Sequence, residues 1–239
     1  MNTRGLLDQL LKSGQDLLQN QAGKGSADKT GGIGDLLGGK GGGSLGSLLS
    51  GAGGGALAAG AMGLLLGSKK ARKYGGKALT YGGLAALGVI AYKAYGNWQA
   101  KQGAAVQGEP QTLDRLPPAQ VEQHSQAILK ALVAAAKSDG HVDERERALI
   151  EGEFVKLSSD QALQHWLHAE LNKPLDPADV ARAASTPEMA AEMYIASVML
   201  VDEEHFMERA YLDELARQLK LDPALKSELE NQVKLAASQ

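Results

Sequence analysis

Residues 120–138, QVEQHSQAILKALVAAAKS, decide the fold class of this chain. The larger apolar side chains in this stretch recur at helical spacing, at Val121, Ile128, Leu129, Leu132, Val133 and Ala136. Spacings of three and four residues place such side chains on one face of an α-helix. We therefore predict an amphipathic helix that buries this face against other helices.

The sequence that follows contains repeated helix-start signals. Three of them pair an N-cap residue with proline at the first helical position, where the missing N–H would have no partner in any case. The expected starts are Asp143, Asp160, Asp176-Pro177, Thr186-Pro187, near Asp202, and Asp222-Pro223. The sequence thus predicts an all-α bundle of about seven helices over residues 119–239, a length that can bury one core.

An acidic turn separates the first two predicted helices, in the stretch AAAKSDGHVDERERALI at residues 134–150. Asp139 and Glu146 have the spacing of the second half of an EF-hand loop, in which carboxylates bind calcium. The first half does not fit, because Lys137 occupies a ligand position, and an ordinary EF-hand is excluded. Asp139, Asp143 and Glu146 could still form a partial carboxylate site. The alternative is that Gly140 ends one helix while Asp143 and Glu146 cap the next.

A weaker version of this pattern lies at residues 197–212, SVMLVDEEHFMERAYL. Asp202 and Glu208 follow an apolar helix end and would join the first three acids as candidate ligands of a divalent cation. The two turns differ in spacing, seven residues from Asp139 to Glu146 and six from Asp202 to Glu208. Apart from such a cation, the sequence indicates no cofactor and no catalytic group.

The N-terminal half is organised around residues 41–68, GGGSLGSLLSGAGGGALAAGAMGLLLGS, which contain no charged side chain. A helix rises about 1.5 Å per residue, so about 20 of these residues would cross a bilayer core of about 30 Å. Small residues fall on one helical face, at Gly51, Gly55, Ala59, Gly63 and Gly67. Such a face favours close helix packing in lipid and would suit homo-oligomerisation. The alternative is a flexible Gly/Ser-rich linker.

A basic cluster follows the uncharged run, at Lys69, Lys70, Arg72 and Lys73. These side chains are expected to contact anionic lipid headgroups, and the positive-inside rule places residues 68–77 in the cytoplasm. A second uncharged run, residues 78–92, would be either the second arm of a hairpin or a helix in the interface. We prefer one span plus an interfacial or re-entrant segment, which leaves the C-terminal domain in the cytoplasm. Two spans would place that domain on the far side of the membrane.

The two halves of the chain carry opposite charge. Residues 1–103 contain 12 Lys/Arg and 4 Asp/Glu, a net +8, whereas residues 104–239 contain 13 and 24, a net −11. An acidic domain argues against binding to nucleic acid. The chain has no cysteine, which excludes disulfides and thiolate metal sites.

Four regions are expected along the chain. Residues 1–40 contain a short amphipathic helix, GLLDQLLKSGQDLLQ at 5–19, followed by a flexible Gly-rich stretch. Residues 41–98 form the membrane-associated region, residues 99–118 a polar linker, and residues 119–239 the helical bundle. The amphipathic helix would lie on a membrane or pair with a partner helix.

The quoted motifs also resemble a known family. AAAKSDGHVDERERALI resembles the signature of tellurite-resistance TerB-like domains, and residues 208–216, ERAYLDELA, are similar to the branch of YebE-type bacterial inner-membrane proteins of unknown function. The resemblance implies a Gram-negative inner-membrane protein with a C-terminal TerB-like domain and a link to envelope stress. Metal binding proposed for TerB-like acids would map here onto Asp139, Asp143 and Glu146.

We therefore expect a non-enzymatic protein anchored in the inner membrane, whose acidic bundle meets an unidentified protein partner or senses a cation. The lipid bilayer is the other expected partner. The alternative is a metal-dependent enzyme that uses Asp139, Asp143 and Glu146. Such an enzyme would need a pocket that gathers these acids and raises the pKa of at least one.

Overall fold

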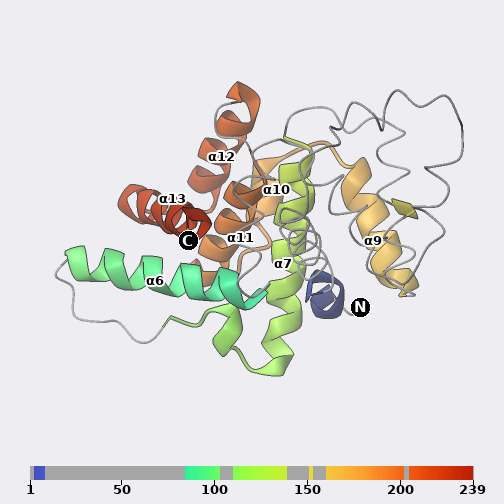
Figure 1. Ribbon diagram of the computed structural model, residues 1–239. Coiled ribbons are helices and arrows are strands. Elements are labelled where there is room, and N and C mark those ends of the chain that lie inside the picture. Colours follow the sequence, from blue (N-terminus) through green and yellow to red (C-terminus); the bar gives the residue numbers. More distant parts are fainter. Residues whose placement is uncertain are drawn as a thin grey trace, which may run out of the picture.

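A computed structural model of the chain describes residues 3–8, 84–102, 110–138, 151–152, 160–201 and 205–238. Every regular element in these ranges is helical, which confirms the predicted all-α class. Besides a short helix at residues 3–8, the elements are α6 (Leu84–Gln102), the 3₁₀ helix η2 (Leu113–Arg115), α7 (Pro118–Ala136), α9 (Gln161–Asn172), α10 (Pro177–Ala181), α11 (Pro187–Leu200), α12 (Phe206–Gln218) and α13 (Pro223–Ser238) (Figure 1).

The helix starts follow the cap signals of the sequence. The Asp160 carboxylate accepts the N–H of Leu163 at 3.2 Å, and the Thr186 hydroxyl accepts the N–H of Met189 at 3.1 Å. Asp176 and Asp222 make the corresponding bonds to Ala178 and Ala224, both at 2.8 Å. Each contact satisfies a backbone N–H that has no partner inside its helix. The predicted starts at these four positions are confirmed.

Helix α11 is the centre of the bundle. All residues from Met189 to Leu200 are buried, including the polar Glu192 and Ser197. A helix that is apolar on nearly every side must be enclosed by other elements. Accordingly, α11 packs against α6, α7, α12 and α13, as Figure 1 shows.

Helix α6 packs within the bundle rather than beside it. Its buried side chains include Leu87, Ile90, Ala91, Ala94 and Tyr95, and the helix contacts α11, α13 and η2. Two other helices of the same chain, α11 and α13, thus cover the apolar face of α6. The expected membrane-associated region, residues 41–98, includes the first part of α6, and its bounds stay a prediction.

The segment expected to be a polar linker also contributes to the bundle. Helix α6 continues to Gln102, and Thr112 and Leu113 are buried at η2. The Arg115 guanidinium lies 4.2 Å from the centre of the Tyr92 ring, which adds a cation–π contact between η2 and α6. Residues 103–109 lie outside the described ranges.

Residues 3–8 form a short helix beside α7, drawn in blue in Figure 1. Leu6 and Leu7 are buried in the same core as α7 and α11. The sequence left open whether this amphipathic segment meets a membrane or a partner helix. In the structure, its first turn lies against the C-terminal domain of its own chain.

Candidate functional site

Most of the residues expected to form sites lie outside the described ranges. These are the candidate cation ligands Asp139, Asp143, Glu146 and Asp202, the small-residue face at Gly51, Gly55, Ala59, Gly63 and Gly67, and the basic cluster at Lys69, Lys70, Arg72 and Lys73. The cation site, the helix-packing face and the headgroup contacts therefore stay predictions.

Glu208 is the candidate ligand that the structure does describe. It is buried in the first turn of α12, where a carboxylate interacts favourably with the helix dipole. Across the described part of the chain, no three acidic or histidine side chains gather closely enough to hold a metal ion. Across the same ranges, no helix combines the length and apolar character that a membrane crossing requires.

Lys137, the residue that breaks the EF-hand pattern, joins two helices. It ends α7, and its Nζ donates to the backbone oxygens of Glu170, at 3.0 Å, and Lys173. Both oxygens lie at the C-terminal end of α9, where carbonyl groups lack helical partners and attract positive charge. The lysine two residues before Asp139 thus fixes α7 to α9.

A second contact joins α7 to α10 through Lys130 and Asp179. The Lys130 Nζ lies 2.8 Å from Oδ2 of Asp179 and also donates to the Asp179 backbone oxygen at 2.9 Å. Arg182 donates to Oδ1 of the same carboxylate at 2.7 Å. These bonds, that from Lys130 first, lower the pKa of Asp179 to about 2. Asp179 is therefore ionised throughout the neutral range.

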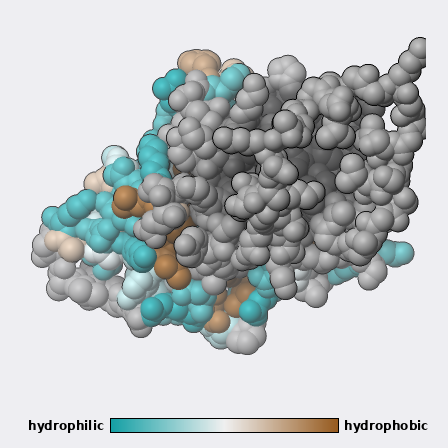
Figure 2. Space-filling model, in the orientation of Figure 1, coloured by the Kyte–Doolittle hydropathy of each residue, from teal (hydrophilic) through white to brown (hydrophobic). Residues whose placement is uncertain are grey.

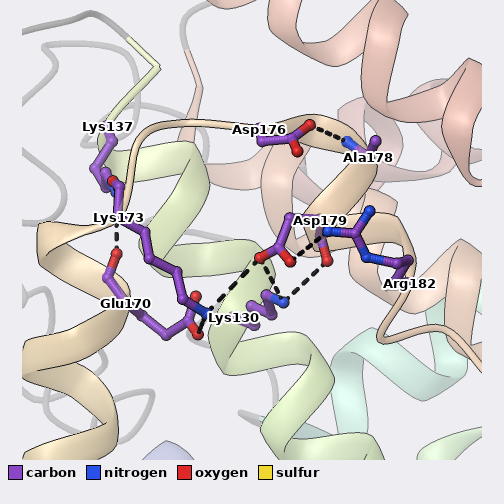
Figure 3. Close-up of polar contacts among 8 residues, drawn as sticks. All are labelled: Lys130, Lys137, Glu170, Lys173, Asp176, Ala178, Asp179 and Arg182. Carbon is purple, nitrogen blue, oxygen red and sulfur yellow. Dashed lines mark hydrogen bonds and ion pairs between the residues drawn. The ribbon is translucent and has the colours of Figure 1, made fainter.

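Figure 3 shows that these contacts form one cluster at the meeting point of α7, α9 and α10. Lys173 completes it, with its Nζ 2.5 Å from Oε1 of Glu170. The α7–α9–α10 charge cluster thus comprises Lys130, Lys137, Glu170, Lys173, Asp179 and Arg182. Its four cations all contact protein oxygens, so the arrangement acts as a cross-brace between three helices.

A polar pair lies in the interior of the bundle. Nδ1 of His124 on α7 is 3.1 Å from Oε2 of Glu192 on α11, and Oε1 of Glu192 accepts the Leu113 N–H at 2.6 Å. Burial raises the pKa of Glu192, while the bonds from His124 and Leu113 partly oppose that rise. Because neither side chain reaches solvent, the pair serves to hold η2 against the core.

Glu122 on α7 receives the N-terminal helix. Its Oε1 accepts the Thr3 N–H at 2.6 Å, and its Oε2 accepts the Arg4 N–H at 3.3 Å. Burial raises the pKa of Glu122, but the hydrogen bonds from Thr3 and Arg4 outweigh it and hold the pKa below its ordinary value. An ionised carboxylate therefore meets the positive end of the short helix.

An exposed apolar pair begins α12. Phe206 is 75% exposed and its neighbour Met207 is 54% exposed. The sequence beside the pair is acidic, with Asp202, Glu203 and Glu204 before it and Glu208 after it. The described surface in Figure 2 is otherwise mainly hydrophilic, with small hydrophobic patches. Two adjacent large apolar side chains therefore face solvent at the start of α12.

Sequence reasoning missed Glu122, His124 and Glu192. A signal for two of them was present, since His124 lies at helical spacing between Val121 and Ile128, and Glu192 interrupts the apolar sequence of α11. Polar residues on an apolar face indicate a buried hydrogen-bonded group. Glu122 carries no comparable signal, because its partner lies 119 residues away in the chain.

Comparison with known proteins finds a family and a relative that are both described as uncharacterized or of unknown function. A family model described as "Protein of unknown function (DUF533)" matches residues 51–233. A relative from Yersinia enterocolitica, described as an uncharacterized protein in the ampR 5' region, is 34% identical over 128 residues, which are 54% of this chain and 91% of the relative. No solved structure matches the chain significantly.

Proposed function

The chain belongs to this DUF533 family, and we propose that it is a non-enzymatic interaction protein held at the bacterial inner membrane by its N-terminal half. The charge distribution supports this role, because residues 1–103 carry a net +8 and residues 104–239 a net −11. The N-terminal half combines basic side chains with the uncharged apolar run 41–68, and its positive charge is attracted to anionic headgroups. The acidic bundle is repelled by the same headgroups. The same proposal includes a TerB-like C-terminal domain, cation sensing by that domain and a link to envelope stress.

The bundle is the part that meets a protein partner. The observation that carries this step is the exposed pair Phe206 and Met207, set in acidic sequence. Aromatic and methionine side chains are enriched in interface cores, and complementary charge steers association. The partner that fits is a protein segment with apolar side chains flanked by Lys or Arg.

Fractionation of cells that contain the full-length chain tests the membrane step. Retention in membranes after carbonate washing is expected if residues 41–68 insert, and release into the wash would indicate headgroup attraction alone. Appearance in the soluble fraction from the start would contradict the membrane role. A variant with Lys69, Lys70, Arg72 and Lys73 changed to Gln separates charge attraction from insertion.

Site-specific photo-crosslinking tests the docking step. A photoreactive amino acid at position 206 is expected to capture a discrete partner in cells, because Phe206 faces solvent in the free bundle. The matched control is position 235, where Leu235 on α13 is 53% exposed. Equal capture at both positions, or no capture at 206, would contradict docking through the start of α12.

A further inference from the structure

We propose that residues 3–8 form a latch that binds either the α7 surface around Glu122 or a lipid surface, so that membrane contact by this segment releases it from the bundle. The inference rests on the proposed membrane association. It concerns a contact that the structure shows directly, between the first turn of the chain and a helix more than a hundred residues later.

The bundle side of the latch has two components. The Glu122 carboxylate accepts the Thr3 and Arg4 N–H groups at the start of the short helix, which have no partner within that helix. Leu6 is 3% exposed and Leu7 is fully buried in the core formed with α7 and α11. The polar contact orients the segment, and the two leucines remove apolar area from water.

The lipid side of the latch comes from the same leucines. If residues 5–19 form the amphipathic helix that the sequence predicts, Leu6 and Leu7 share one side of it with Leu10, Leu11, Leu17 and Leu18. A segment of this pattern lies in a membrane interface with its apolar side in the acyl region. Leu6 and Leu7 cannot be buried in the bundle and in lipid together, so the two contacts exclude one another.

The chain length between the partners allows the exchange. Residues 9–83 separate the short helix from the start of α6. The covalent length of such a stretch sets an upper limit of roughly 250 Å on the distance it can span. Chain length alone therefore does not prevent the segment from meeting a membrane that holds the basic cluster at residues 69–73.

Sedimentation of the full chain with vesicles of phosphatidylcholine and phosphatidylglycerol tests the latch. The variant Glu122→Ala removes the carboxylate that holds the first turn, so the vesicle-bound fraction is expected to rise several-fold. Glu214→Ala is the control, because it removes the same charge from an exposed position on α12 that pairs with Arg217. The double variant Leu6→Ser, Leu7→Ser is expected to bind vesicles less than the wild type.

Cross-linking provides a second measurement. If the contact between residue 3 and residue 122 were merely structural, cross-linking it would leave vesicle binding unchanged. The natural chain has no cysteine, so in the double variant Thr3→Cys, Glu122→Cys a bifunctional thiol reagent finds thiols at these two positions only. The cross-linked protein is expected to bind vesicles less than the same variant before cross-linking. Equal binding before and after cross-linking would overturn the latch.

The outcomes separate the latch from the proposed function. If the wild type, Glu122→Ala and the leucine variant all bind vesicles equally, the latch is overturned and membrane association through residues 41–77 stands. If none of them binds vesicles, both the latch and the membrane role are overturned. A rise that Glu214→Ala reproduces would show a charge effect and would also overturn the latch.

Discussion

Nδ1 of His124 lies 3.1 Å from Oε2 of Glu192, and both side chains are enclosed by the bundle. The other oxygen of the carboxylate accepts the Leu113 N–H, so one side chain of α11 holds both α7 and η2. A buried carboxylate is costly unless its oxygens are hydrogen-bonded. Both oxygens of Glu192 have such a partner, which explains how an acid is retained in the central helix.

Removal of the Glu192 carboxylate tests this arrangement. Glu192→Ala is expected to lower the free energy of unfolding by about 3 kcal/mol, because it leaves the Leu113 N–H and the His124 ring without their buried partner. Glu192→Gln keeps an acceptor for Leu113 and a polar group near His124, so it should cost less. Denaturant unfolding of both variants checks that Glu192→Ala loses more stability than Glu192→Gln. An equal loss of stability would contradict the role of the hydrogen bonds.

The pH dependence of stability gives an independent check on Glu192. Burial raises the pKa of Glu192 above its ordinary value of 4.5, so the folded state binds this proton more tightly than the unfolded state. Its contribution to stability is then fully present below pH 4.5 and is lost as the pH rises through the folded-state pKa. The stability difference between wild type and Glu192→Gln should therefore fall as the pH rises from 4. A difference independent of pH would contradict the shift.

Asp179 should show the opposite dependence. Its pKa is lowered from 3.8 to about 2, so its contribution is present above pH 3.8 and is lost as the pH falls towards 2. Asp179→Asn is expected to cost about 1 kcal/mol at neutral pH, a value reduced for its partial exposure. Asp213→Asn is the control, since that exposed acid pairs with one cation, Lys226, within the described ranges and should cost less. Equal losses of stability in the two variants at pH 7 would contradict the role of Asp179 in bracing α7 against α10.

Two glycines of α6 should respond to alanine in opposite directions. A Cβ at Gly88 would lie 2.3 Å from Oδ1 of Asp114, whereas no atom of the described residues lies within 4 Å of one at Gly96. Gly88→Ala is expected to destabilise the chain by about 2 kcal/mol through this overlap with η2. Gly96→Ala should stabilise it by up to about 1 kcal/mol, because alanine favours a helix interior. Thermal unfolding of both variants tests whether η2 packs on α6.

Lys220 follows the C-cap residue of α12 and has a conformation that favours glycine. Its φ is 57°, and the N–H groups of Lys220 and Leu221 donate to the Arg217 and Ala216 oxygens, both at 3.1 Å. This bond pattern is a Schellman motif, in which glycine is the usual left-handed residue. Lys220→Gly is expected to raise the free energy of unfolding by about 1 kcal/mol. Lys220→Ala retains the strained left-handed backbone and is not expected to raise the free energy of unfolding. A rise in both variants would therefore contradict backbone strain as the cause.

The helical class and most helix starts were predictable because their causes are local. An N-cap side chain bonds to an N–H two or three residues later, so Asp160, Asp176, Thr186 and Asp222 reveal their role in a few letters of sequence. The start of α12 was harder to locate, because its N-cap residue His205 makes no side-chain cap bond. The expected start near Asp202 therefore lies a few residues early.

The place of α6 could not be read from the sequence. An uncharged run with small residues is suited equally to lipid and to the interior of a bundle, because both environments are apolar. The choice depends on which helices come to cover it. In the described structure these are α11 and α13, with Asn97 and Lys101 of α6 bonding to Glu228 of α13 at 2.8 and 2.6 Å.

By itself, the sequence determined the all-α class, the caps and the charge asymmetry, since each depends on residue type and short spacing. Only the tertiary structure decided that α11 is the central helix, that Glu192 meets His124, and that Glu122 receives the first turn of the chain. These contacts join residues 68 and 119 positions apart. The reason is physical: helical periodicity fixes which face is apolar, whereas the partner of that face is fixed only when the helices pack together.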